Sequence, residues 1–190
     1  MPKSALLVMD VQQDIVERHS SDAGYLPRLG GAIDAARAAG LLVVYVVIGF
    51  RPGHPEVSPR NKTFRALAAG GGATGGFVEG DPGARIHPEV RPRDGDIVVT
   101  KKRVSAFAGS DLAMVLGAAG TDSLVLTGIA ASGVVLSTLR QAADLDFGLT
   151  VLEDCCLDAD PEVHRVLTEK VFPRQADVVT TEKWVADLGR

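Results

Sequence analysis

The sequence predicts an α/β fold, a three-layer α/β/α sandwich in which a doubly wound, six-stranded parallel sheet lies between two layers of helices. Uniformly apolar segments of strand length alternate with segments of helical spacing, which is typical of βαβ units. The apolar segments lack the period-two alternation of half-exposed strands, so both sheet faces are expected to be covered. With 190 residues, 46% of them hydrophobic, one domain spanning residues 1–190 is expected.

The six strands are expected in apolar segments rich in β-branched residues, with the sheet order 3-2-1-4-5-6. They cover residues 5–9, 41–48, 96–100, 123–127, 149–153 and 176–180. Helices are expected at residues 29–39, 111–119 and 134–145, from 161 onward and from 181 onward. Gly40 and Gly120 follow two of these helices as C-caps, Ser110 precedes one as N-cap, and Pro161 stands at a first helical position.

The composition argues against several classes of partner. The net charge is -4 and the sequence has no Lys/Arg-rich face, so no nucleic-acid partner is expected. The longest apolar runs, such as residues 41–48, are far shorter than a membrane span, so no membrane partner is expected. The first residues lack the pattern of a signal peptide, and we expect a cytoplasmic protein.

The two cysteines of the sequence are neighbours, Cys155 and Cys156. Adjacent residues rarely form a disulfide with each other, so two free thiols in a reducing compartment are expected. One interpretation is that such a thiol packs as a small apolar side chain. A redox or nucleophilic role is the alternative.

Two irregular stretches are rich in proline or glycine. Residues 49–62 contain three prolines, and residues 70–76 contain five glycines. Long connections in a compact domain are typical of lids and binding loops. We therefore expect a lid or binding loop here, with simple mobility of residues 70–76 as the alternative.

The carboxyl ends of the expected strands bring polar residues to one rim of the sheet, where open parallel sheets bind their ligands. Asp10 ends the first strand and Lys101 ends the third. Arg51 follows the second strand, and a loop of small residues, 128–133, follows the fourth. An acid, two bases and a small-residue loop are expected to converge at this rim.

Asp10 and Lys101 are the first candidate pair. Burial behind five apolar residues raises the pKa of a carboxyl group unless a cation compensates. In the predicted order the first and third strands lie about 9–10 Å apart, two strand spacings, and an extended lysine covers much of that gap. A local cap or salt bridge made by Asp10 is the alternative.

Three segments resemble the isochorismatase-like hydrolase family. Residues 7–14 read LVMDVQQD, residues 96–107 read DIVVTKKRVSAF, and residues 127–138 carry TGI and a later ST pair. The matches occur in the family's order and spacing across most of the chain. The resemblance implies a doubly wound α/β/α sandwich, a homodimer or homotetramer, and a small-molecule substrate.

The resemblance also implies a catalytic triad of Asp, Lys and Cys. Asp10 matches the Asp, which acts as general acid or base, and Lys101 matches the Lys that orients it. The cysteine position falls on Val134. An aliphatic side chain cannot attack a carbonyl, so a thioester intermediate is excluded at that position.

The substrate-binding groups are expected on and around the loop after the fourth strand. The resemblance implies a non-proline cis peptide at Ile129-Ala130 that turns the N–H groups of Ala130 and Val134 toward the substrate as an oxyanion hole. Ser132 is interpreted as a turn or N-cap residue of this loop. Further expected contacts are the loop backbone at Ser132 and Gly133, Arg51 as partner of a substrate carboxylate, and Phe107 as a pocket wall, with rim or dimer packing as its alternative.

Catalysis without the thiol is still open to the chain. Isochorismatases proper also lack the Cys, and there an Asp of raised pKa protonates a vinyl ether before water captures the oxocarbenium ion. We expect Asp10 and Lys101 to hydrolyse a small anionic metabolite in this way, at a vinyl-ether or amide-type bond. The alternatives are a non-catalytic member that binds a small molecule or a partner, and a nucleophilic Cys155 or Cys156.

No metal or other cofactor is expected. The nicotinamidase branch of the family binds a metal through one Asp and two His after the second strand. In this sequence His54 stands alone in that region.

Overall fold

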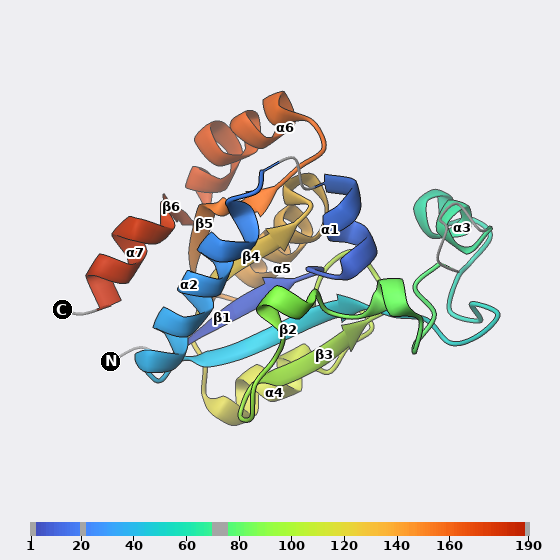
Figure 1. Ribbon diagram of the computed structural model, residues 1–190, viewed down its shortest axis with the longest axis horizontal. Helices are drawn as coiled ribbons and strands as arrows, with labels where there is room; N and C mark the ends of the chain where they lie inside the picture. Colours follow the sequence, from blue (N-terminus) through green and yellow to red (C-terminus); the bar gives the residue numbers. More distant parts are fainter. Residues whose placement is uncertain (1–2, 20–21, 70–75, 189–190) are drawn as a thin grey trace.

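A computed structural model describes residues 3–19, 22–69 and 76–188, and in this part of the chain six parallel strands form one sheet (Figure 1). The strands are β1 (Ser4–Met9), β2 (Leu42–Ile48), β3 (Ile97–Lys101), β4 (Ser123–Ile129), β5 (Gly148–Leu157) and β6 (Asp177–Val179). Their spatial order is β3-β2-β1-β4-β5-β6. The predicted doubly wound sheet and its order are therefore confirmed.

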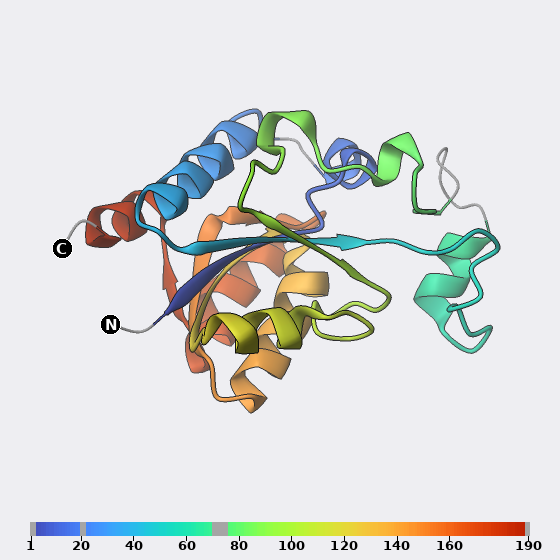
Figure 2. The same ribbon diagram turned by 90° about the horizontal axis from the view of Figure 1, so that it is seen from below.

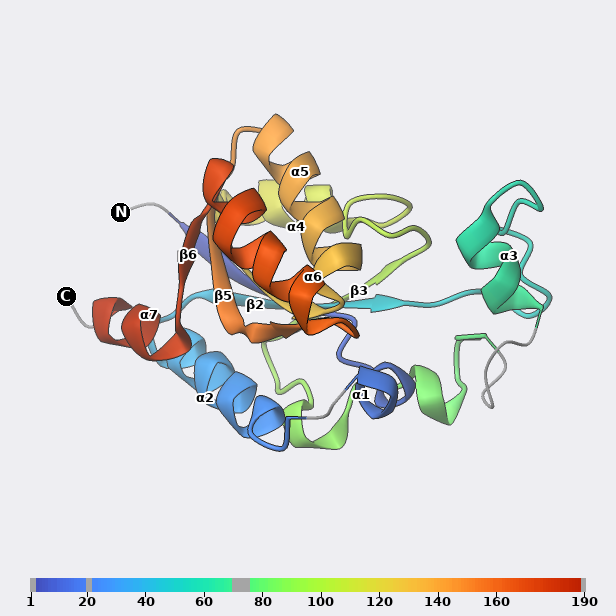
Figure 3. The same cartoon turned by 90° about the horizontal axis from the view of Figure 1, so that it is seen from above.

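Helices cover both faces of the sheet, as Figures 2 and 3 show. The helices are α1 (Gln13–His19), α2 (Tyr25–Ala38), α3 (Lys62–Ala68), α4 (Leu112–Ala119), α5 (Leu136–Asp144), α6 (Pro161–Val166) and α7 (Thr181–Leu188). Helices α1, α2 and α7 lie on one face, and α4, α5 and α6 lie on the other. Helix α3 stands apart, beyond the carboxyl end of β2.

The central strand β1 shows how the sheet supplies both cores. Successive side chains of a strand point to opposite faces. Leu6 and Val8 accordingly pack in the core beneath α2, while Ala5, Leu7 and Met9 pack in the core beneath α4 and α5. Every residue from Ala5 to Met9 is buried, which explains why the sequence shows an uninterrupted apolar run here.

Helices α1 and α3 are absent from the sequence prediction. Each has seven residues, which is too short for the apolar spacing of a helix to be recognised. Helix α3 lies directly after the proline-rich stretch and begins with a side-chain cap, in which Asn61 accepts a hydrogen bond from the backbone N–H of Phe64.

Strand β5 and the segment after β4 differ from their predicted bounds, and α2 begins at Tyr25, before the predicted start at Leu29. Strand β5 extends to Leu157, so Cys155 and Cys156 lie within the strand and not after it. The helix expected to begin at Val134 is preceded by a π-helical turn, Ala131–Val135, which leads into α5. A π-helical turn frequently occurs at a functional site.

The helix caps agree with expectation at one carboxyl end and differ at the other and at one amino end. Gly120 is the C-cap of α4, with a φ angle of 66°, whereas the C-cap of α2 is Ala39 and Gly40 follows it with a φ angle of 72°. The N-cap of α4 is Asp111 rather than Ser110, although the Ser110 hydroxyl accepts a hydrogen bond from the N–H of Leu112.

Two further features of the sequence prediction are the glycine-rich loop and the absence of a membrane span. Of the expected glycine-rich binding loop, residues 70–75 lie outside the described residues. Among the helices that the structure describes, none combines the length and apolar character required to cross a bilayer.

Candidate active site

The carboxyl ends of β1, β2 and β3 point to the same side of the sheet (Figure 1), and there the structure brings Asp10 and Lys101 together. Asp10 follows the last residue of β1, and Lys101 is the last residue of β3. The ammonium Nζ of Lys101 lies 2.9 Å from Oδ2 of Asp10 across the intervening strand β2. The lysine side chain is only 2% exposed, so this is a buried ion pair.

Two opposing influences act on the Asp10 carboxyl. Burial raises its pKa, because a carboxylate loses hydration, while the charge and hydrogen bond of Lys101 and the backbone N–H of Ile48 lower it. The net effect is a pKa above the usual value for Asp. Lys101 divides its hydrogen bonds, since its Nζ also donates to the carbonyl of Arg103 at 3.0 Å. Because the ammonium of Lys101 is shared with this carbonyl, it offsets only part of the rise in pKa that burial causes.

The two oxygens of Asp10 have different surroundings. Oδ2 accepts the ion-pair contact from Lys101, whereas Oδ1 is buried and makes no hydrogen bond with any group that the structure describes. A buried polar atom without a partner is costly and calls for a functional explanation. Oδ1 is therefore the atom of this pair that is available to a ligand.

The backbone at Asp10 is held in an unusual conformation. Its φ angle is 56°, in the left-handed region that non-glycine residues seldom occupy. The Asp10 N–H donates to the carbonyl of Val46 at 2.8 Å. The Gln12 side chain bonds both the N–H and the carbonyl of Ile48, each at 2.9 Å. These bonds tie the turn after β1 to β2, and such strained positions cluster at functional sites.

A cavity of about 200 Å³ opens beside the ion pair. Its polar side chains come from Asp10, His19 and Lys101. Ala130 and Gly133 contribute small residues from the loop after β4. The rest of the wall is apolar: Ile15, Ile48, Phe64, Leu67, Phe77, Val104, Ile129 and Val134.

The loop after β4 contains the expected cis peptide, between Ile129 and Ala130. Its carbonyl at Ala130 accepts hydrogen bonds from the N–H groups of Gly133 and Val135. The N–H of Ser132 donates to Oδ2 of Asp158 at 2.7 Å. These contacts fix the loop against the end of β5 and leave the expected oxyanion donors, Ala130 and Val134, as a prediction.

Three expected substrate contacts are not among the residues that line the cavity. Arg51 is 66% exposed and pairs with Glu56 within its own loop. Phe107 packs in the core beneath α4, with its ring 6.0 Å from that of Phe147. The Ser132 side chain is exposed, and its backbone is bound to Asp158, as described above. The expected partner for a substrate carboxylate is thus not brought to the cavity.

The cysteines lie within the cores on the two faces of β5. Cys155 packs beneath α2 and α7, and Cys156 packs on the opposite face. Burial raises the pKa of the Cys155 thiol to about 11, and it raises that of Cys156 as well. Neither is among the residues that line the cavity.

Several wall residues were missed by sequence reasoning. His19 ends α1, and Phe64 and Leu67 lie on α3, the two helices that were not predicted. Phe77 has a φ angle of 59°, a second left-handed position at the cavity. Gln12, which holds the turn after β1 but does not line the cavity, could have been found from the sequence. It stands in the spacing D-x-Q-x-D directly after a buried strand.

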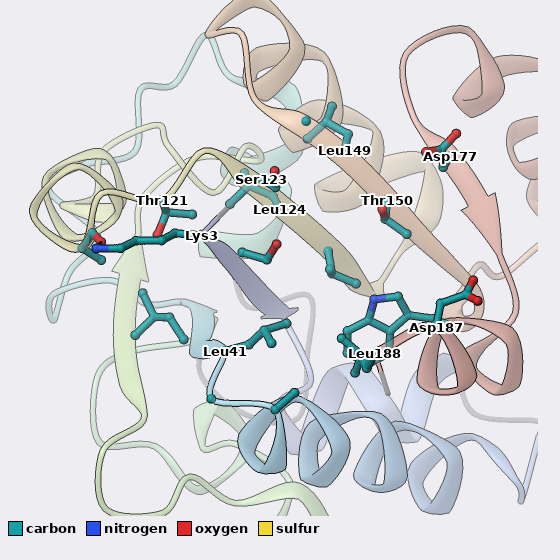
Figure 4. A pocket seen from close by; sticks show the side chains of 18 residues that line it. Lys3, Leu41, Thr121, Ser123, Leu124, Leu149, Thr150, Asp177, Asp187 and Leu188 are labelled. Carbon is teal, nitrogen blue, oxygen red and sulfur yellow. Dashed lines mark hydrogen bonds between the residues drawn. The ribbon is translucent and has the colours of Figure 1, made fainter. Parts of the chain in front are cut away.

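A larger hollow lies at the opposite end of the strands, where their amino ends meet (Figure 4), with a volume of about 850 Å³. Its wall includes Ser4, Ser123 and Gly148, the first residues of β1, β4 and β5. Ligands of open α/β sheets bind at the carboxyl ends of the strands. The smaller cavity at Asp10 is therefore the candidate active site despite its size.

Within the described ranges, no three His, Cys, Asp or Glu side chains are placed to hold one ion. The Nε2 atom of His54 lies 2.9 Å from the carbonyl of Gly76.

Comparison with protein families gives one clear match. Residues 4–183 match the model of the isochorismatase domain. The chain is 31% identical to the isochorismatase family protein YwoC of Bacillus subtilis (strain 168), with 98% of this chain and 94% of that protein covered. It is 32% identical to ureidoacrylate amidohydrolase RutB of Yersinia enterocolitica, with 97% and 86% covered.

Comparison with solved structures agrees. An isochorismatase family protein from Desulfovibrio vulgaris superimposes with a TM-score of 0.86 at 28% identity, and the superposition covers 100% of both chains.

Proposed function

Because the chain belongs to the isochorismatase family, we propose that it is a hydrolase of a small molecule that works by the acid–base chemistry of Asp10 and Lys101, without a covalent cysteine. The observation that carries this proposal is the buried ion pair beside a cavity whose wall includes Val134. Val134 holds the position where the resemblance expects the nucleophile.

The proposed proton donor is Oδ1 of Asp10. Its raised pKa favours the protonated acid, and Lys101 already occupies Oδ2, so the proton belongs on the oxygen that has no partner. After transfer, the ammonium of Lys101 stabilises the carboxylate that remains. A donor of this kind needs no nucleophile on the protein.

The reaction that fits such a donor best is hydrolysis of a vinyl ether. Asp10 gives its proton to the terminal carbon of the double bond, and an oxocarbenium ion forms. Water adds to the cationic carbon, and its proton returns to the carboxylate. The resulting hemiacetal or hemiketal then breaks down to an alcohol and a carbonyl compound.

An amide-type bond is the second substrate class in this proposal. The relative RutB is named as an amidohydrolase of ureidoacrylate, which supports including amides among the candidates. In that case water attacks the carbonyl carbon, and Asp10 protonates the nitrogen as the C–N bond breaks. The proton lost by the water returns to the Asp10 carboxylate, and the products are a carboxylic acid and an amine.

The decisive experiment is a screen of vinyl ethers, amides and esters with the wild type and the variant Asp10→Asn. Asn tolerates a left-handed backbone, so the variant keeps the fold while losing the proton donor. We expect turnover to fall about 10²–10⁴-fold, the usual contribution of a general acid. Unchanged turnover in Asp10→Asn contradicts the proposal.

Asp146→Asn provides a matched control for this experiment. Asp146 is exposed, lies in the turn before β5, and also has a left-handed backbone with a φ angle of 63°. The same chemical change in the same conformation, away from the cavity, is expected to leave turnover at the wild-type level.

A second candidate function is favoured by one observation, the aliphatic side chain at position 134. It is a non-catalytic member of the family that binds a small molecule or a partner at the same cavity. In that case ligands bind without turnover, and Asp10→Asn changes affinity alone. The substrate screen separates the two functions.

A further inference from the structure

The ammonium group of Lys101 on the cavity wall is already engaged. Its Nζ contacts Oδ2 of Asp10 at 2.9 Å and donates to the carbonyl of Arg103 at 3.0 Å. A substrate carboxylate placed here would compete with Asp10 for the same ammonium. It would also lie close to the Asp10 carboxylate whenever that group is ionised.

The guanidinium groups around the cavity are engaged elsewhere. Arg51 pairs with Glu56, and Arg103 donates to the carbonyls of Lys102 and Glu56. Arg103 and Arg18 stack over aromatic residues of the wall, with their guanidinium carbons 6.0 Å from the ring centroids of Phe64 and Phe77 respectively. None of these arginines lines the cavity.

His19 offers a hydrogen-bonding contact. Its Nδ1 lies 2.9 Å from the carbonyl of Ile15, and a carbonyl only accepts, so Nδ1 carries the hydrogen. In the neutral ring Nε2 is then an acceptor. An acceptor suits the N–H or O–H of an uncharged molecule and repels a carboxylate.

The size and apolar character of the cavity wall also limit which ligands can bind. Eight of its side chains are aliphatic or aromatic, and its volume of about 200 Å³ is below the range of about 300–1,000 Å³ for drug-sized ligands. Transfer of an ion into such a space without a dedicated partner is strongly unfavourable, whereas transfer of an apolar group is favourable.

From these contacts we infer that the substrate is small, uncharged and largely apolar, with its polar atoms confined to the end that faces Asp10 and His19. This inference rests on the proposed function, because it names the substrate class of the same cavity. It replaces the anionic substrate that Arg51 led the sequence to predict.

The test uses two pairs of probes that differ by one carboxylate. Phenyl vinyl ether is compared with 4-vinyloxybenzoate, and butyramide with succinamate. Binding is measured by ligand-observed NMR titration of the whole protein, and turnover is followed by product formation. We expect the neutral member of each pair to bind at least tenfold more tightly than the anion.

A cation introduced into the wall is expected to change this preference. Leu67 lines the cavity from α3 and is half-buried, so a longer polar side chain is accommodated there. Leu67→Arg is expected to shift the neutral-to-anion affinity ratio at least tenfold toward the anion. The matched control, Leu67→Met, keeps an apolar side chain and is expected to retain the wild-type preference.

The outcomes separate this inference from the proposed function. Equal or tighter binding of the anions by the wild type overturns the inference, as does failure of both neutral probes to bind. Turnover of a carboxylate that depends on Asp10 overturns the inference and leaves the proposed function standing. Selective binding of neutral probes that are never turned over supports the inference and counts against the proposed function.

Discussion

Asp10 combines three features that rarely coincide in one residue. It is buried, its backbone is left-handed, and only one of its carboxylate oxygens meets a cation. Burial and the single cation act on the pKa in opposite directions, and burial prevails.

The protonation of Asp10 can be measured without a substrate. We expect its carboxyl to titrate above the usual value of about 3.9 for Asp. Carbon-13 NMR of aspartate-labelled protein measures this, and the resonance lost in Asp10→Asn assigns it. Titration at or below the usual value would contradict the proposed proton donor.

The direction of the pKa shift also sets the pH dependence. The folded state holds this proton more tightly than the unfolded chain, so the contribution of Asp10 to stability is present at low pH and declines as pH rises through the folded-state pKa. Turnover that requires the protonated acid falls over the same interval. In Asp10→Asn both dependences are expected to disappear.

Position 134, where the family resemblance expects a cysteine, allows a thiol to be introduced beside Lys101. In Val134→Cys a thiol would share the cavity with Lys101, whose positive charge favours the reactive thiolate. We expect iodoacetamide to alkylate this cysteine faster than Cys155 or Cys156, as measured by peptide mass spectrometry.

Val135→Cys is the matched control for that experiment. Val135 is the next residue and is fully buried in the core, but it is not among the residues that line the cavity. We expect slow alkylation there. Equal rates at positions 134 and 135 would mean that the cavity does not give position 134 its expected reactivity.

The contact between β1 and β4 controls where Asp10 stands. Gly128 of β4 pairs in register with Met9, the residue before Asp10. Its φ angle is 137°, and a Cβ atom at this position would lie 2.1 Å from the carbonyl oxygen of Met9. Only glycine fits so close an approach of the two backbones.

Gly128→Ala is therefore expected to destabilise the protein by about 2 kcal/mol or more, because the strands must separate. Gly117→Ala in α4 is the contrasting control, since a Cβ there meets no atom within 4 Å. That variant is expected to gain about 0.4–1 kcal/mol. Urea unfolding measures both changes, and equal stability of the two variants would contradict the close contact.

At the scale of the whole molecule, each of the two cysteines lies in a different hydrophobic core, so their reactivity measures the opening of both cores. Cys155 belongs to the core beneath α2 and α7, while Cys156 belongs to the core beneath α4 and α5. Burial raises the pKa of both thiols, so little thiolate is present at neutral pH. Each thiol becomes reactive only when its own core opens.

We expect both thiols to be unreactive toward a disulfide reagent in the native protein and to become reactive at the same urea concentration. This follows from one sheet supporting both cores, since loss of β5 opens both faces. The measurement is thiol titration alongside circular dichroism. Rapid modification of one thiol in the native state, with loss of turnover, would instead favour a nucleophilic cysteine.

Assembly and location of the whole molecule stay predictions. The homodimer or homotetramer that the resemblance implies is measurable by sedimentation, and the cytoplasmic location by cell fractionation. The cavity described above is built from the elements of a single chain.

The parts of the site that were predictable are those set by strand ends. Asp10 and Lys101 follow long apolar runs, and parallel strands place their carboxyl ends on one edge, so local sequence was sufficient to bring the two together. Arg51 and Phe107 failed to reach the cavity because they lie in irregular segments, whose paths are set by tertiary contacts such as that between Arg51 and Glu56.

The sequence by itself determined the layered α/β architecture and the pairing of an acid with a lysine, because burial and periodicity are written in consecutive residues. The strand order was expected because it is the usual one for a doubly wound sheet. Only the tertiary structure decided what surrounds the acid–lysine pair. The wall comes from the ends of β2, β3 and β4 and from short helices and loops far apart in the chain, and their convergence leaves one carboxylate oxygen without a partner in a largely apolar space. Local pattern is visible in the sequence, whereas long-range packing is not. The acid was therefore predictable, and the polarity of the cavity around it was not.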